Sequence, residues 1–346
     1  MAELKLAIIG CGAITNGIHL PVSALSDQFE VTVLVDKSLS RARQLADQYG
    51  VPAVADDYRD VVDKVDAAIV ALPNYLHAPV TIDLLQHGVH VLVEKPMALK
   101  ANECDEMIET AQDAEVVLAV GLVCRFFESS RFVRQALKNG LLGQITSVDF
   151  RQGSIFNWQV ASDFMFRKEA AGGGVLMDMG VHALDLLLWW LGDYTNVEYY
   201  DDAVGGVEAD CEVHLRLQCG ATGVVELSRT RNLRNSWIIC GERGTLEVEV
   251  GYKPLISLKT PNQDLVLTGH ATQDGRSDET VHDLFLRQLD DFADAIRNSR
   301  EPFVPGQEGR RAVELIETCY RLRQPLKQPW DSPETQIHDV LEGASL

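Results

Sequence analysis

The stretch that decides the fold is LKLAIIGCGAIT, residues 4–15 of a 346-residue chain. Its first six residues are mostly apolar, Gly10-x-Gly12 follows at once, and the next residues favour a helix. Glycines allow a tight turn and a close approach of backbone to ligand, and the free amides at a helix start stabilise a pyrophosphate. The stretch therefore predicts the glycine turn of a dinucleotide-binding unit. Thr15 stands where glycine or alanine is usual, so a plain strand-to-helix turn stays open.

Strand-like apolar runs alternate with helix-sized segments over the first 120 residues. The runs are residues 4–10, 30–36, 65–73, 89–96 and 116–121, and two of the helical segments are residues 39–50 and 78–88. Strands that are apolar throughout and joined by helices are typical of a parallel sheet covered on both faces. The sequence thus predicts a Rossmann-like, doubly wound α/β domain at residues 1–122.

A different pattern follows after about residue 145. Strand-like runs joined by short turns occupy residues 144–154, 196–204, 209–219, 221–230, 236–242, 244–250 and 254–260. They predict an α+β domain with a large, mainly antiparallel open sheet at residues 123–330. The helical segments 281–299 and 308–324 are expected to pack back on the first domain, and residues 331–346 to form a loose tail.

Composition excludes several classes of protein. A formal charge of −20 disfavours nucleic acid and anionic membranes as partners. The seven scattered cysteines are typical of reduced, intracellular thiols. No metal-ligand spacing appears, the N-terminal apolar run is too short for a signal peptide, and nothing reaches the length of a membrane span. We expect a cytoplasmic protein without a metal site.

Asp36 ends the second predicted strand, about where a carboxylate accepts the ribose hydroxyls of an adenosine. It would repel a 2′-phosphate, which favours NAD over NADP. Lys37 and Arg41 lie close enough to keep NADP open as an alternative. A carboxylate that only caps the next helix is the other interpretation of Asp36.

The stretch GGGVLMDMGVHALDLLLWWLG, residues 172–192, puts Asp178 and His182 four residues apart at the start of an apolar helix. Residues at this spacing share one helix face. Histidine is the side chain whose ordinary pKa suits proton transfer near neutrality. We interpret this segment as one wall of an active-site cleft; a core histidine bonded to a backbone carbonyl is the alternative.

Five motifs in this order resemble the Gfo/Idh/MocA oxidoreductases, over about residues 4–330. They are Gly10-x-Gly12, Asp36, Pro73-Asn74 with His77, Glu94-Lys95-Pro96, and the segment from Gly172 to His182. The resemblance implies a hydride transfer between NAD(P) and a secondary alcohol or ketone of a sugar, cyclitol or nucleotide-linked sugar. Thr15, Leu122, Val123 and Glu128 depart from the family pattern, and the last three bear on substrate choice.

The resemblance also implies a catalytic trio. His182 would be the general acid/base, Lys95 would hydrogen-bond the reacting oxygen, and Asp178 would orient them; the Lys95–Pro96 bond is expected to be cis. The expected cofactor-binding residues are Gly10, Gly12, Ala13, Ile14, Asp36, Lys37, Arg41, Leu72, Pro73, Asn74, His77, Glu94 and Lys95. The expected substrate-binding residues are Arg125, Trp158, Phe164, Arg167, Asp178 and His182.

Three further expectations complete the prediction. Arg229, Arg231 and Arg234 are interpreted mainly as surface charges, with contacts to a substrate phosphate as the alternative. The resemblance implies a homodimer or homotetramer through the sheet of the second domain. It also leaves open a glycoside hydrolase that oxidises its substrate transiently with NAD. A dinucleotide-binding regulator without turnover is the third possible function.

Overall fold

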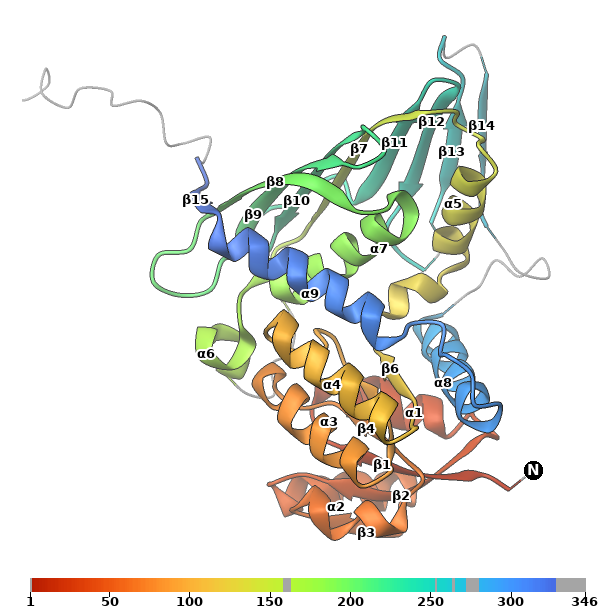
Figure 1. The fold of residues 1–346 in the computed structure, drawn as a ribbon, viewed down its shortest axis with the longest axis vertical. Helices are drawn as coiled ribbons and strands as arrows, with labels where there is room; N and C mark the ends of the chain where they lie inside the picture. The colour runs from red at the N-terminus through yellow and green to blue at the C-terminus, as the bar shows by residue number, and fades with distance from the viewer. Residues whose placement is uncertain (1, 158–162, 253, 263–264, 272–279, 328–346) are drawn as a thin grey trace, which may run out of the picture.

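The computed structural model describes residues 2–157, 163–252, 254–262, 265–271 and 280–327, so the predicted tail lies outside the described part. Within these residues the chain forms one sheet of six strands and one of nine. Figure 1 places the two sheets toward opposite ends of the molecule, with helices between them. The predicted fold class is therefore confirmed.

The six-stranded sheet is parallel throughout, in the order β3-β2-β1-β4-β5-β6. Its strands are β1 (Leu4–Ile9), β2 (Phe29–Val35), β3 (Ala53–Ala55), β4 (Ala67–Val70), β5 (His90–Val93) and β6 (Leu118–Val120). The strand order reverses between β1 and β4, and ligands of such sheets bind beside that point at the carboxyl ends of the strands. The sequence did not predict β3, which has only three residues.

Helices cover both faces of this sheet. Successive strand residues point to opposite sides, and the side chains on both sides are apolar. Leu6 and Ile8 of β1 belong to one apolar core, and Ala7 and Ile9 to the other. The helices of this half are α1 (Leu20–Ser23), α2 (Leu39–Tyr49), α3 (His77–Gln86) and α4 (Ala101–Asp113), with short turns η1 (Thr15–His19), η2 (Tyr58–Asp60), η3 (Val62–Lys64) and η4 (Asn74–Leu76).

The nine-stranded sheet has the order β14-β13-β12-β11-β7-β10-β9-β8-β15. It is mainly antiparallel; β7 with β10 and β8 with β15 are its parallel pairs. Its strands are β7 (Ile145–Gly153), β8 (Tyr194–Asp201), β9 (Asp210–Leu217), β10 (Thr222–Ser228), β11 (Ser236–Gly241), β12 (Gly244–Glu249), β13 (Ile256–Lys259), β14 (Val266–Gly269) and β15 (Arg323–Pro325). The short edge strands β14 and β15 were not predicted.

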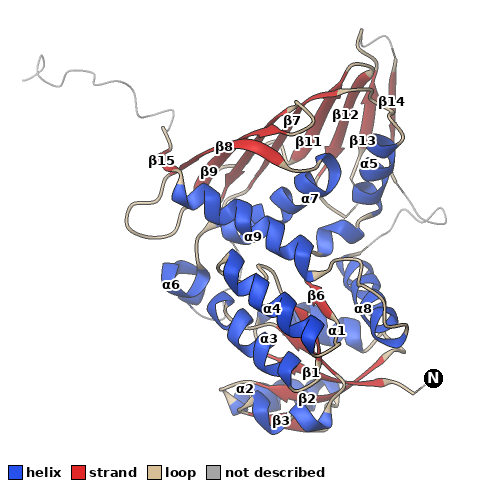
Figure 2. Ribbon diagram, viewed as in Figure 1, coloured by secondary structure: helices blue, strands red, loops and turns tan. Residues whose placement is uncertain are grey.

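The helices of the second half lie on one side of the nine-stranded sheet (Figure 2). They are α5 (Glu128–Lys138), α6 (Lys168–Ala171), α7 (Val181–Leu191), α8 (Val281–Arg297) and α9 (Gly306–Arg321), with η5 (Val123–Phe126), η6 (Asp163–Phe166) and η7 (Leu176–Gly180). Helix α9 contacts both α4 and α7, and α8 contacts α1. One apolar core thus runs from the first sheet into the second half, where it includes Val148 and Leu184.

Buried groups from two distant segments hold the chain where it enters η7 and α7. The Glu208 carboxylate accepts hydrogen bonds from the backbone amides of Gly174 (2.9 Å) and Leu176 (3.0 Å) and from the Tyr320 hydroxyl (2.8 Å). A Cβ on Gly173 would lie 1.8 Å from the Tyr320 hydroxyl, and one on Gly174 would lie 1.9 Å from the Glu208 carbonyl oxygen. The glycines are therefore required for close packing.

Among the described residues, one helical run, Lys168–Leu191, has the length and composition of a membrane-crossing helix. Most of its apolar window is buried inside the molecule, as in the core helix of a globular protein. The sequence predicted no apolar stretch of membrane-spanning length, because the residues around the three glycines were not predicted to form one continuous helical run with α7.

We predict that Gly174→Ala destabilises the protein by about 1–3 kcal/mol or more, the usual cost of overpacking, because its methyl group would meet the Glu208 backbone. The midpoint of urea unfolding measures this. Gly206→Ala is the matched control, since a Cβ there meets nothing within 4 Å. Equal midpoints for the two variants would contradict the packing described here.

Candidate active site

A cavity of about 830 Å³ lies between the two halves and gathers most of the predicted site residues. Its wall contains the predicted residues Gly10, Gly12, Ala13, Ile14, Asp36, Arg41, Leu72, Pro73, Asn74, His77, Glu94, Lys95, Phe164, Asp178 and His182. Lys37, Arg125 and Arg167 are not part of this wall, and Trp158 lies outside the described residues. Of the departures from the family pattern, Val123 contributes to the wall.

The glycine turn fits a dinucleotide. Gly10 has φ +103°, and a Cβ there would lie 2.2 Å from the Ala71 carbonyl oxygen, so only glycine is accommodated. A Cβ on Gly12 would meet nothing within 4 Å, which leaves its backbone open to the cavity. Thr15 is buried, and its hydroxyl donates to the Gly10 carbonyl oxygen (2.5 Å), which explains why threonine fits the third position.

Asp36 lies at the cavity wall just after β2. Its carboxylate accepts the backbone amides of Cys11 (2.9 Å) and Ser38 (2.8 Å), which fix its orientation. Arg41 lies 3.8 Å from the same carboxylate, whereas the exposed Lys37 pairs with Asp57 outside the cavity (3.6 Å). Lys37 does not line the cavity, because neighbouring residues in a chain need not point the same way, and its predicted contact with the cofactor stays a prediction.

Buried polar side chains hold the loops after β4 and β5. The ring nitrogens of His77 lie 2.7 Å from the Pro96 carbonyl oxygen and 2.8 Å from that of Leu72. The Glu94 carboxylate binds the His19 ring (3.0 Å) and the Lys95 amide (3.1 Å). These contacts position the backbone on both sides of Lys95, and the Lys95–Pro96 bond is cis, as expected.

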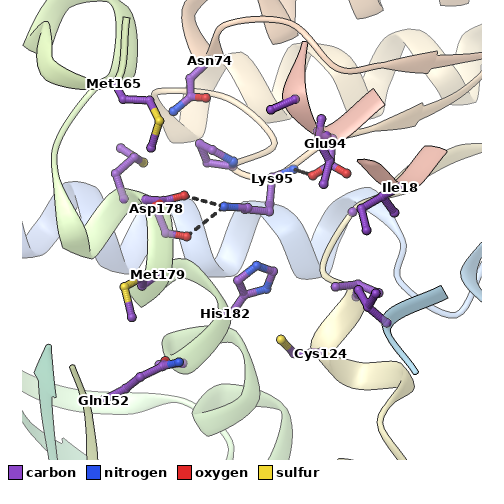
Figure 3. A pocket seen from close by; sticks show the side chains of 18 of the residues that line it. Ile18, Asn74, Glu94, Lys95, Cys124, Gln152, Met165, Asp178, Met179 and His182 are labelled. Atoms are coloured by element: carbon purple, nitrogen blue, oxygen red, sulfur yellow. Dashed lines mark hydrogen bonds and ion pairs between the residues drawn. The ribbon is translucent and has the colours of Figure 1, made fainter. Parts of the chain in front are cut away.

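The centre of the cavity is an ion cluster that joins the two halves. The Lys95 ammonium donates to Asp178 at Oδ1 (2.7 Å) and at its backbone carbonyl (3.0 Å) (Figure 3). The second oxygen of Asp178 accepts from the Arg229 guanidinium. Figure 3 shows the His182 ring close to the Lys95 side chain, whose ammonium points to Asp178. Residues that follow β5 and β10 therefore meet residues of η7 and α7 at one place.

The cluster keeps its members charged. Burial alone would raise the pKa of Asp178, but Lys95 and Arg229 lower it well below its usual range. Burial alone would lower the pKa of Lys95, but Asp178 and Glu94 raise it above its usual value. At neutral pH the cluster thus holds a carboxylate between two cations.

His182 is kept neutral. Burial and the nearby Lys95 cation lower the pKa of His182 to about 3. Its Nδ1 has no hydrogen-bond partner among the described residues, so no described group of the chain fixes which ring nitrogen carries the proton. The imidazole is therefore neutral and has a ring nitrogen without a partner, and its pKa lies far below the near-neutral value expected from the sequence.

Two predicted substrate contacts have other partners. Arg125 is almost fully buried and binds Asp185 through two hydrogen bonds (2.6 and 2.9 Å) and Glu308 (2.6 Å), so it ties η5 to α7 and α9. Arg167 is exposed and lies 3.6 Å from Asp163. Each guanidinium is directed to a carboxylate outside the cavity wall, and a contact of either residue with the substrate stays a prediction.

Arg229 is the site residue that sequence reasoning assigned to the surface. Its side chain is 9% exposed, binds Asp178 and lies over the Phe156 ring (5.1 Å). Its neighbours do bind other carboxylates: Arg231 pairs with Glu226 and Asp210, and Arg234 with Asp149. The available signal was its place at the carboxyl end of a strand whose preceding residues are buried.

Comparisons with known proteins agree with this arrangement. The family described as "Oxidoreductase family, NAD-binding Rossmann fold" matches residues 4–122, and the "GFO/IDH/MocA C-terminal domain" matches residues 130–247.

Among the described residues, no group of three or more histidine, cysteine or carboxylate side chains is placed to hold a metal ion.

Two similar proteins with curated names are both dehydrogenases. The chain is 34% identical to D-glucoside 3-dehydrogenase of Escherichia coli strain K12 over 55% of each chain, so it aligns with about half of that protein. It is 25% identical to myo-inositol 2-dehydrogenase of Thermotoga maritima over 90% of this chain and 94% of the relative. Neither name is that of a glycoside hydrolase or a regulator, so these alternatives gain no support.

Solved structures share the whole fold. Aldose-aldose oxidoreductase from Caulobacter crescentus superposes with a TM-score of 0.83 at 25% identity, covering 93% of this chain and 97% of that one. Levoglucosan dehydrogenase in complex with NADH and levoglucosan superposes with a TM-score of 0.83 over 93% and 98% of the two chains; at 19% identity it supports the fold alone.

We predict that Lys95→Ala raises the pKa of His182 from about 3 toward its ordinary value, because a cation that disfavours the imidazolium is removed. The imidazole proton signals, followed by NMR against pH, measure the shift. Lys64→Ala, which removes an exposed lysine that does not line the cavity, is the control. An unchanged His182 titration in Lys95→Ala would contradict the electrostatic coupling.

Proposed function

We propose a reaction for this chain from one premise: the chain belongs to the Gfo/Idh/MocA oxidoreductase family and carries its NAD-binding Rossmann domain. It is an oxidoreductase that uses a nicotinamide dinucleotide. We infer that it interconverts a secondary alcohol and a ketone on a sugar or cyclitol. The observation that carries this inference is the Lys95–Asp178 contact beside the neutral His182, in a cavity shared by both halves.

The cofactor would be held by the first half of the chain. Gly10 and Gly12 leave room for the pyrophosphate, and Asp36 stands where the ribose hydroxyls of the adenosine would bind. When bound, the nicotinamide accepts or returns the hydride. We propose NAD as the preferred form, because the carboxylate of Asp36 disfavours a 2′-phosphate; Arg41, which pairs with it, keeps NADP within reach.

The chain's own residues would handle the proton and the charge. In the oxidation direction, neutral His182 takes the hydroxyl proton while the Lys95 ammonium donates a hydrogen bond to the same oxygen, where negative charge develops. Asp178 holds the ammonium in place, and Arg229 holds Asp178. In the reduction direction, the imidazolium returns the proton to the ketone oxygen.

We also propose a cytoplasmic homodimer or homotetramer that assembles through the nine-stranded sheet. Its support is the sheet face opposite α5, α7 and α9, which carries no helix among the described residues (Figure 2). Ile238 and Tyr200, on strands of this sheet, are half-buried. The seven cysteines are free of disulfides, in keeping with a reducing compartment.

We predict that Lys95→Ala and His182→Ala each lower kcat by about 10²–10⁴-fold, the usual range for acid–base groups. The assay follows nicotinamide absorbance with a panel of sugars, inositols and nucleotide sugars and with both NAD and NADP. Cofactor binding, measured by fluorescence titration, should stay within a few-fold of the parent protein. Full activity in both variants would remove the proposed mechanism.

Light scattering should give a mass of about two or four times the 38.3 kDa of one chain. The expected reason is burial of the uncovered sheet face between copies. A solution mass near 38.3 kDa at micromolar concentration would refute the assembly.

A further inference from the structure

The helical turn after Gly10-x-Gly12 is held at both of its ends. η1 buries two side chains, Thr15 at its start and His19 at its end. The Thr15 hydroxyl donates to the Gly10 carbonyl oxygen (2.5 Å), which ties the start of η1 to the glycine turn. Between these two residues, Ile18 lines the cavity, so η1 forms part of the cavity wall. Whatever the buried His19 ring contacts therefore bears on the position of that wall.

His19 contacts Glu94, the residue before the proposed catalytic lysine. Its Nε2 lies 3.0 Å from Glu94 Oε1. The second carboxylate oxygen of Glu94, Oε2, accepts a hydrogen bond from the Lys95 amide (3.1 Å). One carboxylate therefore joins the end of η1 to the backbone of Lys95, although 75 positions in the chain separate His19 from Glu94.

The packing around this contact excludes water. His19 is 4% exposed and Glu94 is 7% exposed. A Cβ on Gly121, just after β6, would lie 3.1 Å from Glu94 Oε2, so the glycine leaves room for the carboxylate. On the other side, the Phe285 ring of α8 lies edge to face with the His19 ring, with centroids 5.8 Å apart. The contact is therefore enclosed by β5, β6, η1 and α8.

Burial makes the loss of this contact costly. Burial alone would raise the pKa of Glu94, but His19 and the adjacent Lys95 lower it below its usual value, so Glu94 is a carboxylate at neutral pH. Removal of one partner of a buried, ionised hydrogen bond costs much more than removal of an exposed partner. Without His19, the Glu94 carboxylate would move toward water, and the Lys95 amide that it holds would lose its place.

We propose that His19 is a positioning residue of the active site, which acts through Glu94 to fix the backbone of Lys95 relative to the glycine turn. Asp178 holds the ammonium of Lys95 and Glu94 holds its amide, so both ends of this lysine have a defined partner. His19 itself does not line the cavity, so it acts without touching cofactor or substrate. This inference rests on the proposed oxidoreductase reaction and adds a residue that supports it.

Three variants separate a positioning role from a purely structural one. His19→Leu removes the hydrogen bond, His19→Asn carries an amide too short to reach Glu94, and His19→Gln places an amide N–H near the position of the imidazole Nε2. In the first two, we expect NADH binding, measured by fluorescence titration, to weaken at least about fivefold. We expect kcat to fall at least about tenfold, since small misplacements of reacting groups have large effects on rate. His19→Gln should stay within about threefold of the parent protein in both.

Two further variants test the route through Glu94. Glu94→Met removes the carboxylate, so the addition of His19→Leu should change NADH affinity by less than about twofold, because no buried charge then loses a partner. His87→Leu is the control: His87 is exposed, lies beside the Asp83 carboxylate and does not line the cavity, so both readouts should be unchanged. Urea unfolding of each variant ensures that only folded proteins are compared.

The outcomes separate this inference from the proposed function. Parent-like NADH affinity and kcat in folded His19→Leu and His19→Asn overturn the inference, as does a His19→Gln variant that is equally impaired. An undiminished effect of His19→Leu in the Glu94→Met background also overturns it. If His19→Leu does not fold, His19→Asn and His19→Gln make the same comparison. If the parent protein oxidises no sugar or cyclitol, the proposed reaction fails, and the NADH titrations alone decide the role of His19.

Discussion

The carboxylate of Asp178, held between Lys95 and Arg229, is the constraint on which the cavity depends. Lys95 follows a strand of the first sheet and Arg229 follows a strand of the second, so one anion fixes the distance between the two halves at the place where chemistry occurs. Removal of either cation would leave the partly exposed Asp178 carboxylate with one cationic partner and would break the link between the two halves on that side. Burial, together with the Lys95 cation of this cluster, lowers the pKa of His182 and keeps the imidazole neutral.

The position of this cluster is fixed by hydrogen bonds of the residues around it. His77 and Glu94 fix the backbone beside Lys95, and Glu208 with Tyr320 fixes the chain before Asp178. The supporting groups belong to segments far apart in the sequence. A precise site of this kind requires that most of the fold be formed before its geometry is correct.

Much of the fold could be predicted from the sequence, because its signals are local. Apolar runs predicted the buried strands, and the spacing of Asp178 and His182 predicted two side chains on one wall. Strands β3, β14 and β15 were not predicted, because each has only three or four partly or fully exposed residues, too few to show a periodic apolar pattern. Charged side chains were harder: Arg125 and Arg229 look alike in the sequence, and only distant partners, Asp185 and Asp178, decide that one ties helices together and the other lines the cavity. The predicted domain boundaries, residues 1–122 and 123–330, stay predictions.

The position of α8 has a consequence for how the protein is made. This helix belongs to the end of the chain, yet Phe292 is fully buried and stacks on Phe29 of β2, with ring centroids 5.8 Å apart. During translation one side of the first sheet is covered at first by α1 and α2 alone, and α8 joins them only after most of the remaining chain has been made. A nascent chain that stalls before residue 281 therefore exposes part of this apolar surface to chaperones and proteases, and completion of the nucleotide-binding half is a late event in biosynthesis.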